Sequence, residues 1–408
     1  MSVLKFSEAV TVVRQYASRV SPSAAEFVSL LDGVRLALAE DLIADRDFPP
    51  FARATRDGYA VRATDVMGVP AKLDCIGELK AGASVKQSAV KVGPGEAVEI
   101  MTGAPVPEGA DAVVMVEYTE RQGTTVTVKR TVAAGENVVA AGSEAHKGDV
   151  MVGLGSRVNH AVVAIAAAIG KAEIAVHQRP RVAILATGDE VVDINLPPGP
   201  NEIRNSNSYS LAAQVSEAGG EPLILPVAPD DSTELEVLIR KGAEADLLLL
   251  TGGVSMGKYD LVEQVLEKLG AKFSFTGVLI QPGKPLVFGD LPAPGKTTPF
   301  FGLPGNPVST MVTFQLFVRP VLDALAGARG QAPPFAQAQL TAGFTAKSGL
   351  TRFLPAKLGG THEQPEVEIV KWQGSGDLMA MARANCYIVV PPDKEKFEAG
   401  ETITVLSF

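Results

Sequence analysis

The stretch DLLLLTGGVSMGKYDLVEQVLEKLG, residues 246–270, joins a short apolar run to an amphipathic segment through a glycine-rich loop. Continuous apolar runs that alternate with helical patterns are typical of a parallel sheet with helices on both faces. The alternation extends from about residue 179 to 329, through runs such as RVAILAT and PLILPVA and helical patterns such as STELEVLIRKGAEA. It predicts a doubly wound, mostly parallel α/β domain, whose ligands bind outside the carboxyl ends of the strands.

The rest of the chain has different sequence patterns. Residues 1–46 follow helical spacing and join 141–178 in a helical or linker domain, and the N-terminal helix is expected to pack on the α/β domain. Short strand-like runs between Gly/Pro turns predict an inserted β domain over 47–140 and a barrel-like C-terminal β domain over 330–408. The fold class is therefore a multidomain α/β and β protein, with the α/β domain at 179–329.

Composition narrows the range of partners. The formal net charge of -9 argues against a general binder of nucleic acid or of anionic membranes, which needs a basic surface. The most apolar segment, residues 161–170, has about half of the roughly 20 residues that a membrane-spanning helix needs. Cys75 and Cys386 are too few for a disulfide framework or a zinc spacing, which favours a reducing cytoplasm.

The glycine-rich loop at residues 251–260 lies where such a sheet binds ligands. Gly252, Gly253 and Gly257 could expose backbone N–H groups to an anion, beside the positive end of the next helix. Asp260 followed by Glu263 is also a capping box, which would start that helix without any ligand. Both interpretations stay open. The glycine spacing does not match the Walker pattern of nucleotide-binding loops.

Two further strand ends carry candidate residues. Asp189 and Glu190 follow the run RVAIL, and paired carboxylates there suit a hard cation such as Mg²⁺, although a solvated turn explains them equally well. In the loop FGLPGNPVST, Pro304 and Pro307 stiffen the backbone, and Asn306 is expected to cap the helix that begins at Pro307.

Other polar residues face the same edge if the sheet is parallel. These candidates are Arg204, Ser206 and Asn207 just before a helix, Asp230 after the next strand, and Lys284 in a Pro-Gly turn. Asp231 with Glu234 forms a plausible capping box, which leaves Asp230 as the freer acid. In the inserted region, Asp57 and Thr102 lie in turns that could equally be ordinary hairpins. Trp372 is interpreted as a packing residue.

Several motifs occur in the order found in one enzyme family. The chain resembles molybdopterin molybdenumtransferases of the bacterial MoeA type and the C-terminal enzyme domain of gephyrin, over nearly its whole length. The motifs are RDGYAVR at 56–62, MTGAPVPEGADAVV at 101–114, GENV at 135–138, ATGDE at 186–190, NSNS at 205–208, TGGVSMGKYD at 251–260, QPGKP at 281–285 and GLPGNPVS at 302–309.

The resemblance implies a transferase in molybdenum cofactor biosynthesis. Its substrates would be molybdate and adenylylated molybdopterin, and cleavage of the phosphoanhydride would require Mg²⁺ and release AMP. It also implies a cytoplasmic homodimer with an active site shared between subunits, and transient contacts with other cofactor-synthesis proteins. Neither nucleic acid nor membrane is an expected partner.

The resemblance also assigns roles to residues. Glu190 and Asp260 resemble the family's Mg²⁺ ligands. Asp57 and Thr102 would reach the site from the partner subunit. The remaining catalytic and substrate-binding candidates are Asp230, Pro304, Pro307, Gly252, Gly253, Ser255, Gly257, Arg204, Ser206, Asn207, Lys284, Asn306 and Ser375.

Two departures from the family pattern keep alternatives open. Many relatives have basic residues where Gln281 and Gly277 stand here, so Lys284, Lys258 or Arg204 would have to compensate in binding an oxyanion. A tungstate-inserting or otherwise specialised paralogue is one alternative. A dimeric scaffold that binds partner peptides is an alternative of another class.

Overall fold

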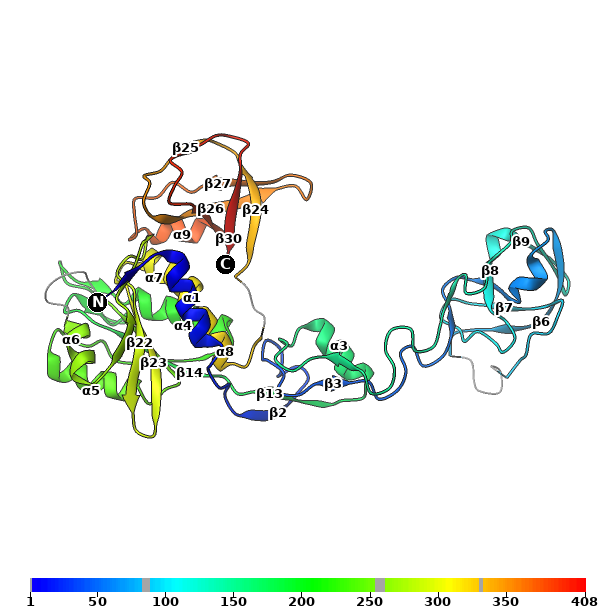
Figure 1. Ribbon diagram of the computed structural model, residues 1–408, viewed down its shortest axis with the longest axis horizontal. Coiled ribbons are helices and arrows are strands. Elements are labelled where there is room, and N and C mark those ends of the chain that lie inside the picture. The colour runs from blue at the N-terminus through cyan, green and yellow to red at the C-terminus, as the bar shows by residue number, and fades with distance from the viewer. Residues whose placement is uncertain (1, 83–88, 254–260, 330–332) are drawn as a thin grey trace. The chain divides into compact units, whose positions relative to one another are not determined.

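The computed structural model describes residues 2–82, 89–253, 261–329 and 333–408 and divides the chain into two compact units. Unit 1 contains Met1–Glu40, Gly155–His160 and Glu173–Phe408, and unit 2 contains Asp41–Leu154 and Ala161–Ala172. Figure 1 shows the elements of both units in chain colours. Each unit is built around its own sheets and hydrophobic clusters.

The central sheet of unit 1 has six strands, of which the first four in sheet order run parallel, the fifth is antiparallel to the fourth, and the sixth is antiparallel to the fifth. This arrangement confirms the predicted mostly parallel α/β domain. In sheet order the strands are β17 (Glu221–Ile224), β14 (Arg181–Ala186), β18 (Leu247–Thr251), β23 (Lys296–Leu303), β22 (Val287–Ala293) and β19 (Lys272–Phe275).

Helices cover both faces of this sheet, as the burial of β14 demonstrates. Val182 and Ile184 belong to one buried cluster, whereas Ala183 and Leu185 belong to another, because successive side chains of a strand point to opposite faces. Burial on both sides explains the continuous apolar run in the sequence. The helices are α4 (Ser206–Glu217), α5 (Ser232–Gly242), α6 (Leu261–Lys268), α7 (Pro307–Thr313) and α8 (Arg319–Leu325), with a π-helical turn at Phe314–Val318 between the last two.

The N-terminal helix α1 (Phe6–Ala17) also belongs to this domain. Ala9 and Val13 are fully buried in the same cluster as Val182, and Figure 1 shows α1 beside α8. The run Pro307–Leu325 is long and apolar enough to span a membrane, but 72% of its window is buried inside the protein, as expected of a core helix.

Residues 1–46 are less helical than the sequence predicts. After α1 the chain forms β2 (Ala25–Ser29), which pairs antiparallel with β13 (Glu173–His177), while β1 (Val3–Leu4) pairs with β20 (Gly277–Val278). The partner strands of β1 and β2 lie more than a hundred residues away, so local periodicity carries no signal of the pairing.

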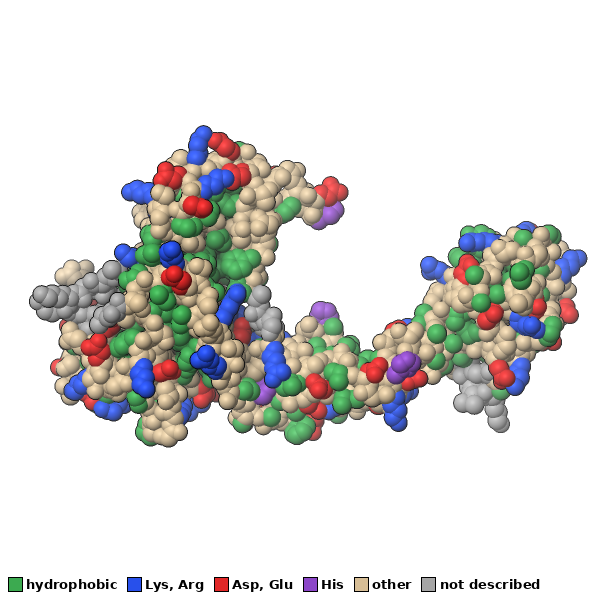
Figure 2. All heavy atoms as spheres, in the orientation of Figure 1, with side chains coloured by type: hydrophobic (Ala, Val, Ile, Leu, Met, Phe, Trp, Pro, Cys, Tyr) green, Lys and Arg blue, Asp and Glu red, His purple; other side chains and the backbone are tan. Residues whose placement is uncertain are grey.

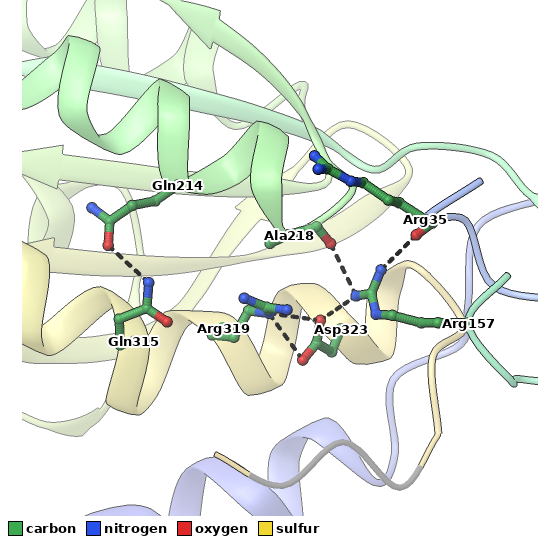
Figure 3. A network of polar contacts seen from close by, with 7 residues as sticks. All are labelled: Arg35, Arg157, Gln214, Ala218, Gln315, Arg319 and Asp323. Carbon is green, nitrogen blue, oxygen red and sulfur yellow. Dashed lines mark hydrogen bonds and ion pairs between the residues drawn. The ribbon is translucent and has the colours of Figure 1, made fainter. Parts of the chain in front are cut away.

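Residues 155–160 are fixed to the α/β domain by a buried polar network (Figure 3). Arg157 donates from Nη1 to the carbonyl of Arg35 at 2.8 Å and from Nη2 to the carbonyl of Ala218 at 2.9 Å, and it forms an ion pair with Asp323. Arg319 Nε donates to both carboxylate oxygens of Asp323 at 3.0 and 3.2 Å. Asp323 is only 5% exposed, so the two guanidinium groups compensate a buried charge.

The C-terminal region of unit 1 is a closed barrel, as predicted. Its strands, in order, are β26 (Thr351–Gly360), β27 (Pro365–Ile369), β24 (Phe335–Leu340), β30 (Thr402–Ser407) and β28 (Cys386–Val390), which pairs back with β26. A short strand of the α/β domain, β21 (Ile280–Gln281), pairs in parallel with β26 and so ties the 281–284 turn to the barrel.

Unit 2 contains the inserted β domain. Its six-stranded sheet has the order β8 (Ala112–Met115), β5 (Gly58–Val61), β7 (Glu96–Ile100), β6 (Ala71–Leu79), β10 (Thr125–Val128) and β9 (Thr119–Gln122). Buried clusters lie on both faces of the sheet. In Figure 2, positive and negative side chains are interspersed over the visible described surface, in keeping with the net charge of -9.

Candidate functional site

The glycines after β18 are required by the backbone itself. Gly252 and Gly253 have φ angles of +89° and +62°, a region that favours glycine. A Cβ atom on Gly252 would lie 2.5 Å from the carbonyl oxygen of Thr187, and one on Gly253 would lie 2.7 Å from Thr187 Oγ1. Backbone conformation and close packing therefore account for the presence of the two glycines, and anion binding by their N–H groups stays a prediction.

Asn207 joins three strand-end loops. Its Nδ2 donates to Thr251 Oγ1 at 3.0 Å and to the carbonyl of Gly305 at 2.7 Å, and Thr251 Oγ1 donates to the carbonyl of Pro304 at 3.3 Å. A Cβ atom on Gly305 would lie only 3.6 Å from Gly252 Cα, so the loops are adjacent. Asn207, predicted as a substrate-binding residue, thus uses its amide N–H groups to hold the loops together.

The expected capping role of Asn306 is wrong. Asn306 occupies the N-cap position of α7, but its side chain accepts no hydrogen bond there. The N–H of Val308, which such a cap would use, instead donates to the carbonyl of Ser375 at 2.9 Å, and Pro307 has no N–H. The Asn306 side chain is left without a hydrogen-bond partner among the described residues. Ser375 therefore reaches this edge through its backbone.

Thr310 supports the same turn from within α7. Its Oγ1 lies 2.6 Å from the carbonyl oxygen of Pro304 and 3.0 Å from that of Asn306, and the residue is 1% exposed. Sequence reasoning missed Thr310 and Thr251. For Thr251, the sequence feature that could have indicated a polar role is its position as the hydroxyl residue at the end of an otherwise apolar run.

Three carboxylates lie at the ends of β14 and β17. The N–H of Asp230 donates to Asp189 Oδ1 at 3.0 Å, which places the two loops together. The side chains of Glu190 and Asp230 are exposed and have no hydrogen-bond or ion-pair partner within the described ranges. A Cβ atom on Gly188 would meet the Glu190 carboxylate at 2.5 Å, so this carboxylate lies over the glycine turn.

These carboxylates form no preassembled metal centre. No group of three or more His, Cys, Asp or Glu side chains that could hold a metal occurs among the residues that the structure describes. Mg²⁺ commonly uses one or two protein carboxylates and completes its shell with phosphate oxygens and water. The free carboxylate of Glu190 fits that chemistry. Asp260, the other predicted ligand, lies outside the described residues, as do Ser255, Gly257 and Lys258.

The helix α4 begins at Ser206, whereas the sequence suggested that Ser206 and Asn207 both precede it. Ser206 and Asn207 are the first two helical residues, because Asn205 caps the helix by accepting from the N–H of Ser208 at 3.1 Å. Arg204 lies just before the cap, on the exposed strand β16 (Ile203–Arg204). The cap predicted at Asp231 is confirmed, since its carboxylate accepts from the N–H groups of Thr233 and Glu234 at 2.9 and 3.0 Å.

A cavity of about 400 Å³ lies beside the 281–284 turn, within unit 1. Four residues predicted from sequence line it together: Lys284, Pro304, Asn306 and Ser375. Gln281 and Trp372 line it as well. The side-chain polar groups of Gln281, Lys284, Asn306 and Trp372 have no protein partner in the described part of the chain. A mostly apolar cavity with a few free polar groups is the usual form of a small-molecule site.

Gly277 takes no part in this cavity. It pairs with Val3 of β1, and a Cβ atom there would lie 3.1 Å from Val3 Cγ2. A long basic side chain at this position would need β1 to move. Of the two departures from the family pattern, only Gln281 lines the cavity.

In unit 2, the two predicted residues Asp57 and Thr102 are in direct contact. Asp57 Oδ1 accepts from the N–H of Thr102 at 2.6 Å and from its Oγ1 at 2.7 Å. These hydrogen bonds, the backbone one first, lower the pKa of Asp57 below its ordinary value because they favour the carboxylate. An exposed, ionised carboxylate is therefore held in a fixed orientation by the 101–105 turn.

Comparison with known proteins covers all parts of the chain. Residues 4–170 match the MoeA N-terminal region (domain I and II), 183–324 match a probable molybdopterin binding domain, and 337–408 match the MoeA C-terminal region (domain IV). A crystal structure of a molybdopterin biosynthesis moeA protein from Pyrococcus horikoshii OT3 has a TM-score of 0.79 and 29% sequence identity, covering 100% of both chains.

Curated relatives agree with these matches. A Bacillus subtilis (strain 168) protein named molybdopterin molybdenumtransferase is 36% identical over 390 residues, covering 93% of this chain and 89% of the relative. A protein of the same name from Staphylococcus aureus (strain Mu50 / ATCC 700699) is 34% identical over 401 residues, covering 97% and 94%. The chain belongs to the MoeA family of molybdopterin molybdenumtransferases.

Proposed function

We propose that this enzyme inserts molybdate into adenylylated molybdopterin, with Mg²⁺-dependent cleavage of the phosphoanhydride and release of AMP. The observation that carries the proposal is the 400 Å³ cavity, which gathers Lys284, Asn306 and Ser375 from separate parts of a chain of this family. Lys284 is the charged residue among the described residues of that lining, and its ammonium group would compensate the charge of an oxyanion.

The other proposed residues serve positioning and charge compensation. The N–H groups of Gly252 and Gly253 would bind phosphate oxygens, and Arg204 and Ser206 would do so from the start of α4. Glu190 would hold Mg²⁺ together with Asp260, and the ion, when bound, neutralises charge on the phosphoanhydride. The chemistry needs reactants held in fixed geometry rather than a nucleophilic side chain, and the hydrogen-bonded strand-end loops supply a rigid frame for it.

The direct test is AMP release by the purified chain. With adenylylated molybdopterin, molybdate and Mg²⁺ together, AMP and metal-charged cofactor should appear, and omitting Mg²⁺ should stop the reaction. Glu190→Gln should need more Mg²⁺ for the same rate, whereas a lowered rate at every Mg²⁺ concentration would point to another role. A folded chain that releases no AMP would overturn the proposal.

A homodimer with shared active sites is part of the proposal, with Asp57 and Thr102 reaching the site of the partner subunit. At a Mg²⁺ concentration that is limiting for Glu190→Gln, Asp57→Asn and Glu190→Gln should each be nearly inactive alone, but mixing the two proteins should restore activity through dimers with one intact site. Mixing Glu190→Gln with Asp230→Asn, both altered on the same side, is the matched control and should restore nothing. Equal behaviour of the two mixtures would contradict a shared site.

Tungstate insertion, or a specialised paralogue, is the second candidate. The observation behind it is Gln281, a neutral residue in the cavity lining that changes the groups offered to an oxyanion. Replacing molybdate by tungstate in the AMP assay separates the two, because a tungstate enzyme should reach its half-maximal rate at a lower tungstate than molybdate concentration. The cytoplasm stays the proposed compartment, supported by two cysteines that are both free and buried.

A further inference from the structure

We infer that Trp372, the single tryptophan of the chain, forms the wall against which a flat heterocyclic ring of the substrate lies in the cavity beside the 281–284 turn. The inference rests on the proposed function, because adenylylated molybdopterin offers two such rings, the pterin and the adenine. It assigns a ring-binding role to a residue that the sequence suggested only for packing.

The segment around Trp372 is held in place from two sides. The Asp377 carboxylate closes the loop that follows Trp372 by accepting from the N–H groups of Gln373 and Ala380, both at 3.0 Å. The carbonyl of Ser375 accepts from the N–H of Val308, the first N–H of α7, at 2.9 Å, which fixes the loop to the α/β domain. A side chain on a loop anchored twice can present a surface of defined position to a ligand.

The cavity has the composition that a flat heterocycle needs. Its walls are mainly apolar and include Ile280, Pro282 and Leu350 in addition to Trp372. Polar groups are few, and those of Gln281 and Lys284 are free of protein partners in the described ranges. A heterocycle has apolar faces and polar edges, so its faces match the walls and its edges match the free amide and ammonium groups.

Trp372 itself has unused binding capacity. The residue is partly buried against the main hydrophobic cluster and also lines the cavity, so packing accounts for only part of its surface. Its indole N–H has no hydrogen-bond partner, and its ring has no aromatic partner, among the described residues. A tryptophan with a polar handle and an aromatic surface left over is suited to stacking on a planar ligand.

The first experiment uses the unaltered protein, because one tryptophan makes the fluorescence of the chain specific for this site. Neopterin and AMP are titrated separately, with N-acetyltryptophanamide as the control for optical absorption. Saturable quenching by neopterin assigns the wall to the pterin, and saturable quenching by AMP assigns it to the adenine. No saturable response to either, or a response to molybdate alone, would overturn the ring contact.

The second experiment uses two variants and calorimetric titration with whichever ring compound binds. Trp372→Leu should weaken Kd about 10-fold or more, since base–aromatic stacking supplies roughly that factor, while Trp372→Phe should stay within about threefold. Phe408→Leu is the matched control, because Phe408 is an aromatic residue of the same barrel, 49% exposed and outside the cavity. Equal Kd for Trp372→Leu and the unaltered chain would overturn the inference.

The outcome for the ring contact is distinguishable from that for the proposed function. If the unaltered chain releases AMP and Trp372→Leu does so with an unchanged KM, the ring contact fails while the function stands. If neopterin or AMP quenches Trp372 but no AMP is ever released from adenylylated molybdopterin, the ring contact stands while the function fails.

Discussion

Replacing Thr251 by valine tests whether the strand-end loops act as one rigid unit. Thr251 is 2% exposed, and its hydroxyl accepts from Asn207 Nδ2 at 3.0 Å and donates to the carbonyl of Pro304 at 3.3 Å. Valine keeps the shape of the side chain and removes both hydrogen bonds. The substitution therefore removes the Thr251 hydrogen bonds between the loops without opening a cavity.

The expected loss of stability follows from these contacts. A buried hydrogen bond contributes about 0.5–1.5 kcal/mol net, so two lost bonds would cost up to about 3 kcal/mol. Both former partners keep another bond, because Asn207 still donates to Gly305 and the Pro304 carbonyl still has the Thr310 hydroxyl at 2.6 Å. The free energy of unfolding should fall by about 1–2 kcal/mol, measured by urea denaturation.

The effect on activity should exceed what this stability change explains. Without the Thr251 hydroxyl, the 304–306 turn loses its hydrogen bond to the end of β18, and small displacements of binding groups lower rates steeply. We expect kcat/KM for AMP release to fall about 10-fold, in protein that is still fully folded at the assay temperature.

Thr298→Val is the matched control. Thr298 is 1% exposed, and its hydroxyl donates to the carbonyl of Ala243 at 2.6 Å, near the amino end of β23 and away from the strand-end loops. It should lose similar stability with no change in kcat/KM. If Thr251→Val kept a kcat/KM within about twofold of this control, loop positioning by Thr251 would be refuted.

Three other changes have defined outcomes. Asp323→Ala should lower the free energy of unfolding by about 2–4 kcal/mol in urea denaturation, because two guanidinium groups lose a buried carboxylate. Thr102→Val should raise the pKa of Asp57 toward its ordinary value in an NMR titration, because the hydroxyl hydrogen bond is lost. In the unaltered protein, the stabilisation linked to the lowered pKa of Asp57 is present above the ordinary pKa and is lost as pH falls through the lowered pKa. Gln281→Lys should lower the KM for molybdate and for tungstate by the same factor, about 10-fold; unequal factors would contradict a purely electrostatic effect.

The fold of the α/β domain was predictable because one physical pattern dominates it. Burial on both faces favours apolar residues throughout strands such as β18, where only the last residue, Thr251, is polar, and this pattern is visible without any partner strand. The strand Ala25–Ser29 was not predictable, since four of its five residues are exposed, the fifth is only partly buried, and its partner is Glu173–His177. Pairing across such a separation is decided by tertiary contacts.

The site was predictable to the level of loops but not of atoms. Parallel strands bring their carboxyl ends to one edge of the sheet, so the topology alone predicted that Lys284 and Asn306 lie near each other. Only the family resemblance predicted that Ser375 lies near them. The partner of each side-chain hydrogen bond could not be predicted from the sequence. Asn207, predicted to bind substrate, donates its amide N–H groups to Thr251 and Gly305, whereas Asn306, predicted to cap a helix, has no side-chain hydrogen bond among the described residues.

These contacts distinguish side chains that join the strand-end loops from side chains that have no partner among the described residues. Asn207 Nδ2 is engaged by protein partners, whereas the side chains of Gln281 and Lys284 have none within the part of the chain that the structure describes. Replacement of a basic residue by Gln281 therefore changes the charge offered to the ligand and not the frame that holds it. Molybdate and tungstate have the same charge and nearly the same shape, so a lost positive charge weakens both alike. Selectivity between them would have to come from the geometry of the free groups, and Gln281 alone is a reason to expect weaker oxyanion binding rather than a different metal.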